Sequence, residues 1–116
     1  MAVTVAARNI AADAVGAAVS HQSLHTNDGG ADGLSGELTG GAYAKQVPSY
    51  STGAATGIDD LTAAVVFDAG GTVQTVTHLG FWGSAGSVWL GSVALTVSKQ
   101  MSGTDTLTIT SAPITA

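Results

Sequence analysis

The chain has 116 residues, a length that fits one domain, so we expect residues 1–116 to fold as a single unit. Its net charge is −5, and three basic residues cannot neutralise a row of phosphates, which excludes nucleic acid as a partner. The absence of cysteine excludes disulfides, thiolate nucleophiles and cysteine-ligated zinc.

The composition predicts a surface with very little charge. Charged residues make up 9% of the chain, against roughly 25% in ordinary soluble domains. Hydrophobic residues reach 45% but aromatic residues only 5%, so alanine supplies much of the apolar content and the core must be thin. Because soluble chains normally carry more charge, we expect partners to cover much of this surface, as in a subunit of an assembly.

Residues 4–19 are predicted to form a helix with Thr4 as its N-cap. Four apolar residues are spaced to share the face that packs on the body or on another subunit: Ala7, Ile10, Ala14 and Ala17. Arg8 and Asp13 interrupt the apolar stretch, which also falls short of a membrane span, so we expect neither a signal peptide nor a membrane anchor.

The remainder, residues 20–110, is expected to be a β-rich body. Alternating or extended patterns predict strands over six segments: 20–26, 40–47, 61–67, 72–82, 88–97 and 104–110. Tyr43 is expected to anchor the core, and a tight turn at 84–86 joins the fourth and fifth strands as a hairpin. These elements predict a mainly β fold, a small antiparallel β-sandwich or barrel-like domain with one N-terminal α-helix.

Two features indicate where partners bind. Residues 27–36 (NDGGADGLSG) form a glycine-rich loop, and such loops often lie at contact surfaces. Phe81 and Trp82 are neighbours on one strand and face opposite sides, so we expect one of them to be available outside the core. The expected interface residues are Asn27, Asp28, Asp32, Leu34, Ile10, Trp82 and Trp89.

No group of residues selects a catalytic or metal site. His21 and His25 would stand roughly 13 Å apart on a strand, too far to share one ion. Residues 83–86 (GSAG) lack the spacing of a nucleophile elbow, and the adjacent Asp59 and Asp60 would point in opposite directions on a strand. We therefore expect no enzymatic activity, no metal, no cofactor and no small-molecule substrate.

Several short segments resemble a family of small virion structural proteins of tailed bacteriophages. The resemblance rests on residues 23–28 (SLHTND), 40–46 (GGAYAKQ) and 76–82 (VTHLGFW), followed by Leu90, Gly91, Ala94 and Leu95. Members of this family are labelled as head-decoration or tail-fibre proteins. The resemblance implies a virion protein with a compact β fold, present in many copies and without enzymatic activity.

Within this family the expected function is capsid decoration. Such a cement protein would bind the major capsid protein on the outer surface of the head and stabilise it through subunit contacts. A slender fibre usually needs a coiled coil or repeats, and the sequence shows neither. We expect a homo-oligomer, with a trimer as one form. The alternative is a tail-associated or fibre-like protein that binds the host receptor, with Trp82, Trp89 or Tyr50 stacking on sugar rings.

Overall fold

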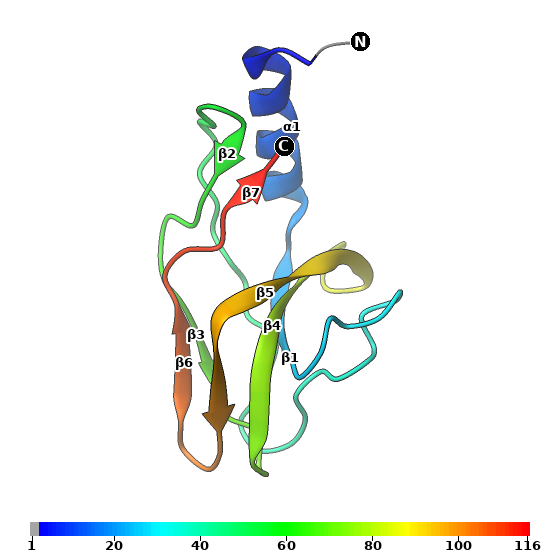
Figure 1. Ribbon diagram of the computed structural model, residues 1–116, viewed down its shortest axis with the longest axis vertical. Coiled ribbons are helices and arrows are strands. Elements are labelled where there is room, and N and C mark those ends of the chain that lie inside the picture. The colour runs from blue at the N-terminus through cyan, green and yellow to red at the C-terminus, as the bar shows by residue number, and fades with distance from the viewer. Residues whose placement is uncertain (1–2) are drawn as a thin grey trace.

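In the computed structural model, which describes residues 3–116, the chain is elongated and measures 47 × 27 × 26 Å, with one helix at the end of a β-rich body (Figure 1). The helix is α1 (Val5–Ala18). The strands are β1 (His21–His25), β2 (Ile58–Asp59), β3 (Val65–Asp68), β4 (Gln74–Gly83), β5 (Val88–Met101), β6 (Thr106–Ile109) and β7 (Ile114–Thr115). The predicted fold class, mainly antiparallel β with an N-terminal helix, is confirmed.

The strands form three antiparallel sheets, and two of them enclose the core. The larger sheet has the order β1-β4-β5, and β3 pairs with β6 beside it. Leu24 of β1 lies opposite Leu79 of β4, and both belong to one buried cluster with Phe67 of β3, which has no exposed surface. The third sheet, β2 with β7, lies next to α1 and links the helix to the body (Figure 1).

Strand β5 is long, bent and at the edge of its sheet. Val76 pairs with Lys99 and His78 pairs with Ala94, so four residues of β5 lie opposite one residue of β4. Extra residues of this kind bend a strand, and β5 turns sharply between its two halves in Figure 1. Its first half crosses the body near α1.

Helix α1 has almost the predicted boundaries but a different packing face. The hydroxyl of Thr4 accepts a hydrogen bond from the Ala7 N–H at 3.1 Å, which confirms the predicted N-cap. The buried helix residues are Ala12 and Gly16, whereas all four residues predicted to share the packing face are exposed, Ile10 by 71%. The prediction that this face packs on the chain's own body is therefore wrong, because the polar side of the helix makes the contacts with the body.

The strand predictions succeed in the alternating segments and fail in the glycine-rich segment 40–47 and at the two shortest strands. Five of the six predicted segments contain strands, but residues 40–47 contribute only a bridge between Gln46 and Gln22. Gly40 and Gly41 both have positive φ there, and Pro48 has no N–H for a ladder. Tyr43 from this segment is half-buried against the core, as expected. The two-residue strands β2 and β7 are too short to show a periodicity.

Candidate interaction surface

The glycine-rich loop 27–36 is held by its own side chains. The side-chain oxygen of Asn27 accepts from the Gly29 N–H at 2.9 Å, and Asp28 accepts from the Gly30 N–H at 2.9 Å. Asp32 accepts from the Leu34 N–H at 3.1 Å. These polar side chains are exposed but hold turns of the loop, while the Leu34 side chain is 74% exposed and makes the loop a candidate contact.

Beneath this loop, Trp82 takes part in a buried polar network, and Trp89 packs beside it. The Trp82 indole N–H donates to the Ser23 hydroxyl at 2.8 Å, and the same hydroxyl lies 2.6 Å from His25 Nε2. His25 Nδ1 lies 2.9 Å from the Ser35 carbonyl. Because that carbonyl only accepts, Nδ1 is the donor, and we assign the Ser23 hydroxyl as donor to Nε2. Each polar atom in this chain of bonds therefore has a partner.

This arrangement corrects the expectation for Trp82. Its side chain is only 5% exposed, so it is a buried residue of this chain and offers no surface to a partner or a sugar. Trp89 is half-buried and packs against Trp82, with ring centroids 5.0 Å apart in an edge-on arrangement. The side that would carry an exposed tryptophan is covered by loop 27–36, whose Gly33 lies directly against both rings.

The pair of Ser23 and His25 has the atoms of a nucleophile and base but no access for a substrate. Both residues have no exposed surface. His25 also contacts the Trp89 ring at a centroid distance of 5.3 Å, and a buried hydroxyl with two partners has no free direction for attack. We interpret the network as a structural contact that joins β1, β4 and the loop.

The adjacent carboxyl groups of Asp59 and Asp60 have opposite environments. Asp59 is 1% exposed; burial raises its pKa, and the neighbouring Asp13 carboxyl raises it further through a hydrogen bond and its charge. Burial also acts to raise the pKa of Asp60. There, however, hydrogen bonds from the Ser111 hydroxyl and the backbone N–H groups of Ala112 and Leu61 outweigh burial, so its pKa is lowered.

No metal centre is formed by the described part of the chain. Within residues 3–116, no three His, Asp or Glu side chains gather closely enough to hold an ion. His21 and His25 lie at the two ends of β1, opposite Trp82 and His78 respectively. None of the helices in this range is long and apolar enough to cross a membrane.

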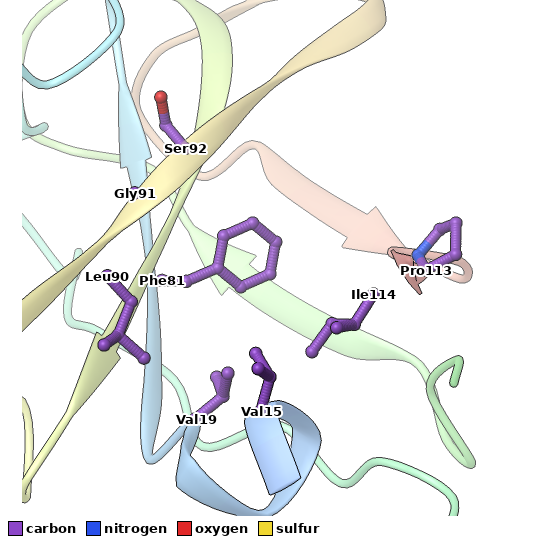
Figure 2. Close-up of a pocket in the computed structure, with 8 residues that line it drawn as sticks. All are labelled: Val15, Val19, Phe81, Leu90, Gly91, Ser92, Pro113 and Ile114. Atoms are coloured by element: carbon purple, nitrogen blue, oxygen red, sulfur yellow. The ribbon is translucent and has the colours of Figure 1, made fainter. Parts of the chain in front are cut away.

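An apolar groove runs between α1, the large sheet and β7 (Figure 2). We call it the Phe81 groove; its cavity is about 210 Å³ and its lining includes Val15, Val19, Phe81, Leu90, Pro113 and Ile114. A second apolar hollow of about 220 Å³ continues along β5 and shares Pro113 with the first. Every residue lining either hollow is uncharged. The sequence analysis missed this groove because its residues come from four elements that no local pattern connects.

The predicted interface residues therefore do not form one surface. Ile10 lies on α1 at the end of the body, whereas Leu34 lies in the loop beside the large sheet (Figure 1). Both are strongly exposed, and the two tryptophans are not. The features that remain open to a partner include the outward face of α1, the Phe81 groove and the tip of the loop.

These features are typical of a small β-rich structural module that acts through its surface. Comparison with protein families supports this class of protein and identifies the family. Residues 5–116 match the family model described as Podophage GP4 fiber I protein gp80, and the chain belongs to this family. No curated protein matches the chain. The family confirms the resemblance to phage virion structural proteins and gives the chain a location in the virion.

Proposed function

We propose that this chain is a structural subunit of a fibre on the phage tail. The family match carries the proposal, because it extends over residues 5–116 and its description names a fibre protein. The shape supports it: the described chain is 47 Å long and 27 Å wide, with α1 at one end of the long axis (Figure 1). Such a subunit can be joined to its neighbours at its ends and along its sides.

The geometry supports a role in building the fibre rather than in binding the host surface. Sugar-binding sites commonly use exposed aromatic rings, and all six aromatic residues of this chain are buried or half-buried. Tyr50, the third residue considered for sugar stacking, has its hydroxyl bonded to the Ala112 carbonyl at 2.8 Å. The large hydrophobic side chains that are exposed are instead all aliphatic, which suits contacts between protein subunits.

Capsid decoration is the second candidate. One observation favours it: the described chain is a single β-rich unit only 47 Å in its longest dimension with one 14-residue helix, and this part of the chain lacks the long rod that a slender fibre needs. In that case the apolar surfaces would contact the major capsid protein on the head. A fibre made of several different chains would also account for a short subunit, and the family description favours the fibre.

Electron microscopy of gold-labelled virions distinguishes the two candidates. An antibody raised against the purified chain is bound to intact particles, and the labelled position is recorded. The fibre proposal expects gold at the tail or at thin projections from it. Gold spread evenly over the head would overturn this proposal and support capsid decoration.

A further inference from the structure

Helix α1 is attached to its own body through polar side chains. The Asn9 side-chain oxygen accepts from the Gly57 N–H at 2.7 Å, and the Asp13 carboxylate accepts from the Ala54 N–H at 3.0 Å. Both backbone donors belong to the segment that leads into β2, the strand that carries Asp59. Asp13 therefore helps to bind the helix to this segment.

A second carboxyl group lies at the same attachment. Asp59 is within hydrogen-bonding reach of Asp13 and is only 1% exposed. Its Oδ2 atom lies toward α1, because a Cβ added to Gly16, which follows Asp13 by about one helical turn, would be 3.3 Å from that atom. Two acidic side chains from different elements thus meet beneath the helix, and one of them is closed to solvent.

The two oxygens of the Asp59 carboxyl group have different surroundings. Oδ1 accepts a hydrogen bond from the Ser51 hydroxyl at 3.1 Å. Oδ2 is buried, and no N–H or O–H group within residues 3–116 donates to it. A buried carboxylate oxygen without a donor is strongly destabilising, whereas a protonated carboxyl group is itself a donor. With a proton on Oδ2, Asp59 can donate to the Asp13 carboxylate, and the unpartnered oxygen then has a partner.

No positive charge on the neighbouring elements is paired with these two carboxyl groups. The other titratable groups on α1, on residues 49–61 and on residues 113–116 are Arg8, Tyr50, Asp60 and the Ala116 carboxylate. Within residues 3–116 the one ion pair lies elsewhere, so Arg8 neutralises neither Asp13 nor Asp59. Asp60 accepts from the Ser111 hydroxyl, and the Tyr50 hydroxyl donates to the Ala112 carbonyl. Two neighbouring carboxylates repel each other, so this arrangement favours one bound proton.

We propose that Asp13 and Asp59 share one proton and form a pH-dependent latch, which holds α1 against β2 while the proton is bound and loosens the helix when it is lost. The chemical step is an acid dissociation: the O–H bond of Asp59 breaks, the proton goes to water, and two facing carboxylates remain. Their repulsion then acts across the attachment of the helix. This inference goes beyond the fibre function and does not depend on where in the virion the chain lies.

The direction of the pH effect follows from the environment of Asp59. Burial raises its pKa, and the hydrogen bond and charge of Asp13 raise it further. In the loosened form water reaches the Asp59 carboxyl group, which then has the ordinary aspartate pKa of about 3.9. Between this ordinary value and the raised one, the closed form binds one proton more than the loosened form. The ratio of closed to loosened molecules therefore falls about tenfold per pH unit in this window and is highest below it.

Backbone hydrogen exchange of the full chain, followed by NMR from about pH 4 to pH 8, tests the latch. Each observed rate is divided by the intrinsic rate at the same pH, because exchange is itself catalysed by base. The amides of α1 around the buried Ala12, and the Ala54 amide, are expected to lose protection by up to about tenfold per pH unit as the proton leaves. Amides of β4 around the buried Leu79 are expected to keep theirs.

Asp59→Asn is the decisive variant, because its side-chain amide can donate to Asp13 at every pH. Protection of its α1 amides is expected to be independent of pH. Asp68→Asn is the matched control, since it removes one carboxylate from an exposed position on β3, and it is expected to keep the wild-type pH dependence. The same pH dependence of α1 protection in the wild type and in Asp59→Asn would overturn the latch.

Carbon-13 NMR titration of the side-chain carboxyl groups tests the shared proton separately. In the wild type, the Asp59 signal is expected to titrate above the ordinary aspartate range. Asp13→Asn should lower the pKa of Asp59, because the neighbouring charge is gone while the new side-chain oxygen can still accept from the Ala54 N–H. An Asp59 signal that titrates at the ordinary value, or that Asp13→Asn leaves unmoved, contradicts the pairing of the two groups.

Discussion

The contact between loop 27–36 and the tryptophans can be tested by adding one methyl group to the loop at Gly33. Gly33 has φ of +77°, and a Cβ added there would lie 2.8 Å from the Trp82 ring and even closer to the Trp89 ring. Gly30 in the same loop has φ of +68°, but its Cβ would meet only the Ser35 Cβ at an ordinary 3.5 Å. Alanine would therefore be strained by its positive φ at both positions, but only at position 33 would its Cβ collide with the tryptophan rings.

Gly33→Ala and Gly30→Ala should therefore differ in stability. Holding alanine at positive φ costs roughly 1–2 kcal/mol at either position. The collision with the buried rings adds about 1–3 kcal/mol for Gly33→Ala, as overpacking does elsewhere. Urea unfolding monitored by tryptophan fluorescence measures both, because Trp82 and Trp89 are the only tryptophans of the chain. Equal unfolding free energies for the two variants would refute the packing of the loop on the rings.

Three further predictions concern the buried polar groups. Because burial raises the folded-state pKa of Asp59, its contribution to stability is present below the ordinary aspartate pKa and is lost as the pH rises through the raised value. Asp59→Asn should therefore gain stability relative to the wild type between about pH 4 and pH 7, and a constant difference in melting temperature across this range would contradict the assignment. Asp60 has a lowered pKa, so Asp60→Asn should lose stability relative to the wild type above the ordinary aspartate pKa and little below it; a loss that persists at acid pH would show that charge is not the cause. Ser23→Ala should cost about 1–3 kcal/mol in chemical unfolding, since it leaves the Trp82 N–H and a His25 ring nitrogen without a partner, and a neutral effect would contradict the network.

Much of the fold is predictable from the sequence because its strong patterns are local. The alternation around β4 and the small residues at its turn are enough to predict the β4–β5 hairpin, and Thr4 marks the start of α1. Strands β2 and β7 are held by their pairing with each other across 55 residues, a long-range contact that a two-residue pattern cannot indicate.

The interaction surface was less predictable, for physical reasons. The spacing of Ala7 and Ile10 correctly indicates a common helix face, but which face touches the body depends on the polar contacts of Asn9 and Asp13 with distant backbone groups. For Trp82, alternation along the strand indicates the side of the sheet and not whether a loop covers that side. The exposed Leu34 and Ile10 remain predicted contact residues.

The most direct test of the central claim is the number of copies of this chain in a virion. Quantitative mass spectrometry of purified particles gives the ratio of this chain to the major capsid protein. A tail-fibre subunit is expected at a small fraction of the capsid protein, because a tail offers few attachment points. A ratio near one copy per capsid subunit, or a simple lattice fraction of it, would contradict the fibre assignment and support decoration of the head.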